Sequence, residues 1–154
     1  IMQAYEQGGH AYHATMPTDA LRTFHGVMLE TIGLGLEHTK ARQQDLGERV
    51  RKLLTARGFK SVAAPGFQAP GVVVSYTDDP HIKNGSRFAG AGLQIAAGVP
   101  LRCHEPEGFQ TFRLGLFGLD KLTNVDRTVA TLESALDQMG AGPVASPSTS
   151  ISAQ

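Results

Sequence analysis

The sequence predicts a small α/β (α+β) domain in which helices cover a mostly antiparallel sheet. Two stretches with apolar residues at helical spacing come first, short strand-like runs follow, and a last stretch returns to helical spacing. A chain of 154 residues suits one domain of ordinary size. We expect an extended arm over residues 1–17, the domain over residues 18–139, and a disordered tail over residues 140–154.

Two helices are expected at the start of the domain. The first has Thr18 or Asp19 as a candidate cap, and Gly33 and Gly35 should end it. The second should end at Arg57-Gly58, where glycine suits a left-handed cap and arginine suits the negative helix terminus. The apolar stripes of the two helices are Leu21, Phe24, Met28, Leu29 and Ile32, and Leu46, Val50, Leu53 and Leu54.

Strand-like runs occupy the middle of the chain. Residues 71–76 contain three consecutive valines, which is typical of a buried strand, and residues 59–63 and 93–97 are shorter candidates. Residues 80–91 favour a short helix that Asn84-Gly85 weakens. In residues 109–117, apolar residues alternate with Thr111, Arg113 and Gly115, which predicts a half-buried strand.

A closing helix follows. Thr123 and Asp126 have the spacing of a capping box, and the helix that they would open carries an apolar stripe of Val125, Val129, Leu132, Leu136 and Met139.

The composition excludes several function classes. Fourteen basic residues balance fourteen acidic ones, which argues against a nucleic-acid or anionic-membrane surface. No apolar run is long enough for a membrane span, and the first residues do not form a signal peptide. The single cysteine excludes an internal disulfide and fits a reducing compartment, so we expect a cytoplasmic protein.

Common site motifs are absent. The sequence has no phosphate loop, dinucleotide fingerprint or nucleophile elbow. His10, His13, Cys103 and His104 are too few and too scattered to predict a metal site, so none is expected. Cys103 lies between Arg102 and His104, which could lower its pKa and make it a nucleophile, although a lone unreactive thiol is the preferred interpretation.

Arg113 is the most informative polar residue. It lies on the face of its strand opposite Phe112 and Leu114, and Gly115 leaves space beside it. A guanidinium there could form paired hydrogen bonds with a carboxylate ligand, or it could pair with a structural carboxylate or reach water. The spacing alone leaves these alternatives open.

Several motifs resemble the C-terminal part of class V aminotransferases, the alanine–glyoxylate aminotransferase type. Tyr12-His13-Ala14-Thr15-Met16-Pro17 resembles the Tyr-His-x-Thr-x-Pro segment of that family, and Phe112-Arg113-Leu114-Gly115-Leu116-Phe117-Gly118 resembles its Leu-Arg-Ile-Gly-Leu-Leu-Gly strand. Gly35-Leu36-Glu37 and Asn124-Val125-Asp126 are similar to further family segments. The resemblance runs in order over about residues 12–139.

The resemblance implies a fold type I enzyme with pyridoxal 5'-phosphate as cofactor, acting as a homodimer. Tyr12 and Thr15 match residues that reach the cofactor phosphate of the partner subunit, and residues 1–17 would be an arm from the cofactor domain. Arg113 matches the arginine that binds the substrate carboxylate. The implied reaction is transamination between an amino acid and a 2-oxo acid such as glyoxylate or pyruvate.

The resemblance also implies that this chain is inactive alone. The family's Schiff-base lysine precedes the tyrosine segment, and none of the five lysines here has a matching context, so this segment has no catalytic residue. The chain opens on Ile1, as a piece of a longer enzyme would. Two alternatives remain: part of a cysteine desulfurase that uses Cys103, or a non-catalytic ligand-binding α/β module.

Overall fold

The computed structural model describes residues 2–9 and 15–140, and it divides into two compact units, Ile1–Leu36 and Glu37–Gln154. The first unit contains α1 (Met2–Glu6) and α2 (Thr18–Leu34). The expectation of an extended start is therefore wrong for α1. The expected tail lies outside the described residues, apart from Gly140.

The ends of helix α2 lie at Pro17 and Gly35, and no side chain caps its first turn. Pro17 precedes its first turn without any side-chain cap, so the expected capping by Thr18 or Asp19 is wrong. Gly35 ends the helix with a φ of 90°, as the glycine pair predicts. No residue of α2 is buried, and its large apolar side chains, from Leu21 to Leu34, are exposed.

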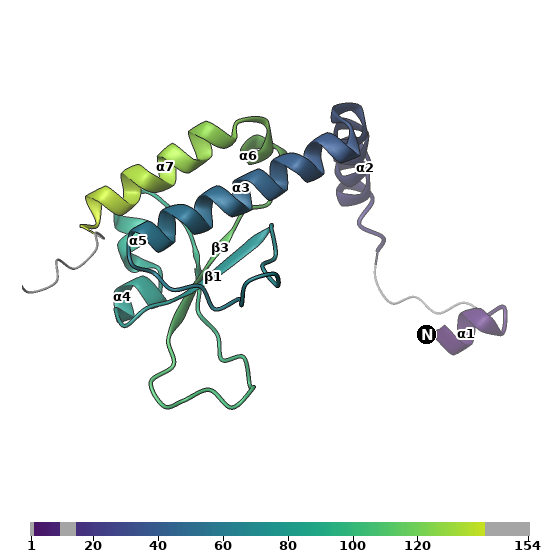
Figure 1. The fold of residues 1–154 in the computed structure, drawn as a ribbon. Coiled ribbons are helices and arrows are strands. Elements are labelled where there is room, and N and C mark those ends of the chain that lie inside the picture. The colour runs from purple at the N-terminus through teal and green to yellow at the C-terminus, as the bar shows by residue number, and fades with distance from the viewer. Residues whose placement is uncertain (1, 10–14, 141–154) are drawn as a thin grey trace, which may run out of the picture. The chain divides into compact units, whose positions relative to one another are not determined.

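The second unit is built on a three-stranded antiparallel sheet (Figure 1). Its strands are β1 (Val72–Tyr76), β2 (Ala96–Ala97) and β3 (Thr111–Gly115), in the order β1-β3-β2. The strands predicted from the valine run and from the alternating run are confirmed. Of the two shorter candidates, the one at residues 93–97 is confirmed only for Ala96 and Ala97, which form β2, and residues 59–63 make only one isolated bridge, Ser61 to Ser75.

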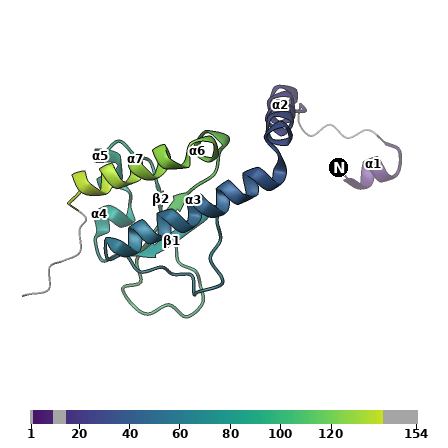
Figure 2. The ribbon, with the colours of Figure 1, turned by 45° about the horizontal axis from the view of Figure 1, so that its top comes forward.

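Two long helices cover one face of this sheet. They are α3 (Leu36–Ala56) and α7 (Val125–Gln138), which lie side by side in both views (Figures 1 and 2). Arg49 pairs with Asp126 at 2.7 Å near the start of α7, and Arg57 pairs with Asp137 at 2.6 Å near its end. From the first pair to the second, the residue number rises in both partners. Helices α3 and α7 therefore run parallel.

Three short helices complete the unit. They are α4 (Pro80–Lys83), α5 (Ser86–Gly90) and α6 (Leu119–Thr123). Gly85, with a φ of 82°, separates α4 from α5, so the weak point at Asn84-Gly85 breaks the predicted helix in two. The expected capping box of α7 is wrong: Thr123 closes α6, and the Asn124 side chain caps α7 by accepting from the Arg127 amide.

The core lies between the sheet and the helices. The buried residues at its centre come from both predicted helical stripes of this unit and from alternate positions of the strands: Leu46, Val50, Leu54, Val73, Phe112, Leu114, Leu116, Val125, Leu132, Leu136 and Met139. Phe112 contacts the rings of Phe59 and Phe88 at centroid distances of 5.2 and 5.6 Å. Since this core takes Phe112 and Leu114, the residue between them belongs to the other face of β3.

Candidate functional site

Arg113 occupies the middle of the central strand, on the face turned away from the helices. Val74 of β1 and Ala96 of β2 are its cross-strand partners. Along the strand, Gly115 is the next residue on the same face. These neighbours are small or apolar, and Arg113 itself is half-buried. A charge in such a partly desolvated setting interacts more strongly with an opposite charge than it would in open water.

One hydrogen bond fixes the guanidinium. The Nε–H of Arg113 donates to the carbonyl oxygen of Ala97 at 3.0 Å. Because a guanidinium is planar, a bond at Nε fixes the plane in which the two Nη atoms lie. The pair of Nη atoms is the edge that receives a carboxylate in a fork of two hydrogen bonds.

The arginines of the second unit have two kinds of partner. Arg49, Arg57 and Arg87 pair with carboxylates, whereas Arg113, like Arg51 and Arg127, donates to a backbone carbonyl. Within the described residues, no carboxylate lies within ion-pair distance of Arg113. The pairing with a structural carboxylate that the sequence left open is therefore not found in this part of the chain.

The two predicted cofactor-binding residues belong to the first unit. Thr15 is exposed in the non-helical residues just before α2. Tyr12 lies outside the described residues. Thr15 belongs to the first unit and Arg113 to the second.

Cys103 lies in an irregular loop between β2 and β3. It is exposed, and its neighbours Arg102 and His104 both have a positive φ, at 59° and 67°. The Glu105 carboxylate accepts from the amides of Arg102 and Cys103 at 2.5 and 2.9 Å. Backbone hydrogen bonds, its own amide first, hold the pKa of Glu105 below its usual range. The Glu105 carboxylate thus holds the backbone of this loop at Arg102 and Cys103.

Metal sites and membrane-spanning helices are both absent from the described residues. In residues 2–9 and 15–140, no group of three or more His, Cys, Asp or Glu side chains could hold a metal ion. Across the same residues, no helix has both the length and the apolar character needed to cross a membrane.

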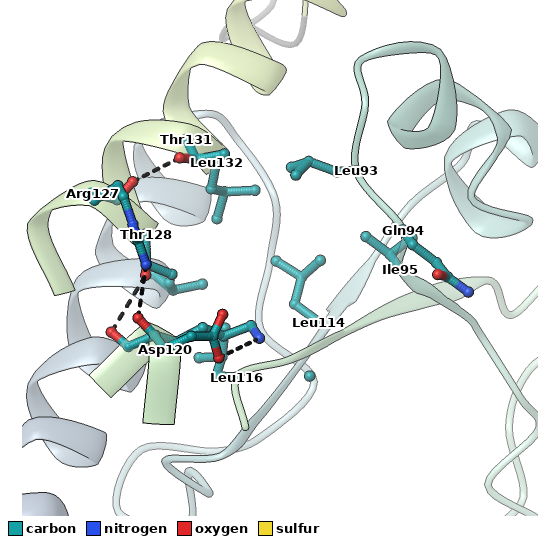
Figure 3. Close-up of a pocket in the computed structure, with 13 residues that line it drawn as sticks. Leu93, Gln94, Ile95, Leu114, Leu116, Asp120, Arg127, Thr128, Thr131 and Leu132 are labelled. Carbon is teal, nitrogen blue, oxygen red and sulfur yellow. Dashed lines mark hydrogen bonds and ion pairs between the residues drawn. The ribbon is translucent and has the colours of Figure 1, made fainter. Parts of the chain in front are cut away.

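A cavity of about 240 Å³ lies on the core side of the sheet (Figure 3). Leu93, Leu114 and Leu132 point into it, and Asp120 and Arg127 lie at one end. Lys121 also lines the cavity. Several of the polar groups that line it are already engaged: Lys121 lies 3.6 Å from Asp120, and Arg127 donates to the Asp120 carbonyl. The hydroxyls of Thr128 and Thr131 donate to backbone carbonyls of α6 and α7. The cavity is therefore a gap in apolar packing, behind the strand face that carries Arg113.

Ala97 and Gly98 shape the surroundings of Arg113, and neither was predicted as a site residue. A signal was present, because the run Ala96-Ala97-Gly98 has only small side chains at the end of a candidate strand. Glycine in a strand context marks places where another backbone approaches closely. A Cβ built on Gly98 would lie 1.8 Å from the carbonyl oxygen of Thr111.

Comparison with known proteins relates this fold to an aminotransferase. No family model and no curated protein matches the sequence. Among solved structures, the chain is similar to ureidoglycine–glyoxylate aminotransferase from Bacillus subtilis, with 22% identity and a TM-score of 0.57. The match covers 84% of this chain and 33% of that one, so the chain spans about a third of that enzyme's length. At this identity the likeness shows the fold.

Proposed function

We propose that this chain is the C-terminal part of a class V aminotransferase and that Arg113 binds the carboxylate of its substrates. The observation that carries the proposal is the setting of Arg113. It is a half-buried cation in the central strand, anchored at Nε, with no carboxylate partner in the described residues. A fold shared with an aminotransferase gives that setting a function.

The substrates would be an amino acid and a 2-oxo acid such as glyoxylate or pyruvate. Every substrate of a transamination of this kind carries a carboxylate, and both half-reactions use the same site. One arginine fork can therefore orient all of them. The matched enzyme is named for glyoxylate, which supports glyoxylate as the amino acceptor here.

The described residues fit a supporting role toward pyridoxal phosphate, in which they bind the group without reacting with it. Thr15 is an exposed residue, and in the proposal its hydroxyl and that of Tyr12 are neutral donors of the kind that bind phosphate oxygens. Lys40 and Lys121 are ion-paired with Glu37 and Asp120, and none of the five lysines matches the family's reactive lysine. When bound, the cofactor supplies an electron sink for the amino group transfer.

In this proposal the chain acts as part of a cytoplasmic homodimer. Tyr12 and Thr15 would reach the cofactor phosphate of the partner subunit, while Arg113 serves the carboxylate. The reactive lysine and the partner of the pyridine nitrogen would belong to a cofactor domain outside this chain. The 154 residues alone would then be inactive.

The first test is the absorption spectrum of the full-length enzyme with pyridoxal phosphate, before and after addition of alanine or serine. We expect a visible cofactor band that shifts when the amino acid is added. A well-folded enzyme without such a band would favour the non-catalytic ligand-binding module.

The second test is the variant Arg113→Ala in the same enzyme. Loss of a charged hydrogen-bonded pair should lower kcat/KM for carboxylate substrates by about 10- to 100-fold. Cofactor affinity should not change, because Arg113 is not assigned to the cofactor. Unchanged kinetics would refute the assignment of Arg113 while leaving the cofactor test intact.

A further inference from the structure

We infer that Gly98 is a positioning residue for substrate binding. The missing side chain at Gly98 lets the Ala97 carbonyl hold the Arg113 guanidinium in the orientation that receives a carboxylate. This inference rests on the proposed function of Arg113, and it adds a residue that does not itself touch the substrate.

The first part of the argument is the contact between Gly98 and β3. Ala97 pairs with Phe112, so Gly98 comes opposite Thr111. A Cβ on Gly98 would lie 1.8 Å from the Thr111 carbonyl oxygen and 2.6 Å from its Oγ1. Real Cβ atoms essentially never approach other atoms closer than 3.0 Å. Any residue larger than glycine must therefore shift the backbone by about 1 Å or more.

The second part of the argument is that neither Thr111 nor Gly98 can move easily. Thr111 is 2% exposed and lies in the central strand, whose other edge pairs with β1. On its own side, the Gly98 amide donates to the Lys83 carbonyl at the end of α4, at 3.3 Å. A larger side chain would have to push the segment at residues 97–98 away from β3.

The third part connects this shift to Arg113. The Ala97 carbonyl and the Cα of Gly98 belong to one planar peptide unit, so they move together. The bond from Arg113 Nε to that carbonyl is 3.0 Å long. An outward movement of about 1 Å takes it beyond hydrogen-bond length. Arg113 then keeps its charge but loses the contact that fixes the plane of its fork.

The anchoring bond is tested first in the unaltered 154-residue chain. We would measure by NMR how fast the Arg113 Nε–H exchanges with water, with its signal assigned by its loss in Arg113→Lys. We expect exchange at least about tenfold slower than at Arg22, an exposed arginine of α2. Equal exchange at the two arginines would overturn the inference without needing any Gly98 variant.

The role in binding is tested with Gly98→Ala in the full-length enzyme. Gly90→Ala is the matched control, because a Cβ at Gly90 meets nothing within 4 Å. For Gly98→Ala we expect KM for alanine to rise about tenfold with kcat within about twofold, and fast exchange at Arg113 Nε–H. Ethylamine, which has no carboxylate, should react as slowly with this variant as with the unaltered enzyme.

A double variant separates positioning from general damage. In an Arg113→Lys background, Gly98→Ala should raise KM no further, because the anchored group is already gone. Additive effects, or an equal loss toward alanine and ethylamine, would mean that Gly98 matters only for stability. A missing cofactor band in the unaltered enzyme would instead refute the proposed function. A normal band together with Gly98→Ala kinetics equal to those of Gly90→Ala would refute only the present inference.

Discussion

At the scale of single residues, Gly47 shows how closely α3 packs on the chain that leads into β1. Gly47 is buried, and a Cβ there would lie 2.7 Å from the Pro70 carbonyl oxygen and 2.9 Å from its Cα. One helical turn to either side, Gln43 donates to Pro70 at 3.0 Å and Arg51 donates to Ala69 at 2.5 Å. The three positions lie on one face of the helix. They hold residues 69–72 against α3, and this lets β1 begin at Val72.

We therefore predict that Gly47→Ala destabilises the second unit by about 1–3 kcal/mol. Alanine gains about 1 kcal/mol of helix propensity over glycine, but this gain should not offset the contact with Pro70. The measurement is the free energy of unfolding in urea. Gly90→Ala, at an open position in the same unit, should change it by less than about 0.5 kcal/mol. A neutral or stabilising Gly47→Ala would show that residues 69–72 are loosely held.

For single residues, prediction from the sequence succeeded where the spacing of apolar residues decides which side chains are buried. That spacing is every second residue in a strand and about 3.6 residues in a helix. The alternation in β3 placed Arg113 opposite Phe112 and Leu114, and the burial of those two residues confirms it. The carbonyl that holds Arg113 was not predictable from periodicity, because it comes from a strand of two residues. So short a strand leaves no periodicity to read.

At the scale of elements, α4, α5 and α7 are joined through one ion pair. The Asp79 carboxylate caps α4 by accepting from the amides of His81 and Ile82, and it pairs with Arg87 of α5 at 2.7 Å. Arg87 also donates to the Met139 carbonyl at the end of α7. The hydrogen bond from Arg87, followed by those from the two amides, holds the pKa of Asp79 below its ordinary value of 3.8. The ion pair between α4 and α5 therefore requires the ionised carboxylate, and Arg87 extends the link to α7.

The link should make stability depend on pH on the acid side. Because the folded pKa lies below the ordinary one, the stabilisation is complete above the ordinary pKa and is lost as pH falls through the folded pKa. Asp79→Asn keeps a capping side chain but loses the charge. It should lower the urea midpoint at pH 7, and its difference from the unaltered chain should shrink between about pH 5 and about pH 2.

Asp78→Asn is the control for this prediction, since Asp78 is the exposed neighbouring carboxylate. Its urea midpoint should match that of the unaltered chain at both ends of the range. A constant difference between Asp79→Asn and the unaltered chain at all pH values would mean that the Arg87 pair adds nothing to capping.

The positions of helices and strands were predicted well where apolar residues repeat at regular spacing. They were predicted less well where a capping residue decides at which residue a helix begins. Helices α3 and α7 and strands β1 and β3 lie close to their expected places. The expected cap at Thr123 failed because α6 takes that residue and Asn124 provides the cap. Capping depends on which of several adjacent polar residues has the right backbone angles, and composition does not reveal those angles.

At the scale of the whole molecule, the buried core and the helix with the exposed apolar side chains, α2, belong to different units. Every residue of the core cluster lies between Leu46 and Met139, in the second unit. Helix α2 has seven large apolar side chains that are exposed: Leu21, Phe24, Val27, Met28, Leu29, Ile32 and Leu34. The sequence predicted an apolar stripe on α2, but a stripe does not identify the surface that covers it. In the proposed function, that surface would be the cofactor domain.

We predict that a chain of residues 37–154 folds with the stability of the whole chain. Since every residue of the core cluster lies within residues 46–139, its free energy of unfolding in urea should lie within about 0.5 kcal/mol of the value for residues 1–154. A chain of residues 1–133, which lacks the buried Leu136 and Met139, is the destabilised control. A loss of more than about 2 kcal/mol on removing residues 1–36 would show that α2 stabilises the second unit. Its apolar side chains would then have a partner within this chain, and the cofactor domain would not be needed to cover them.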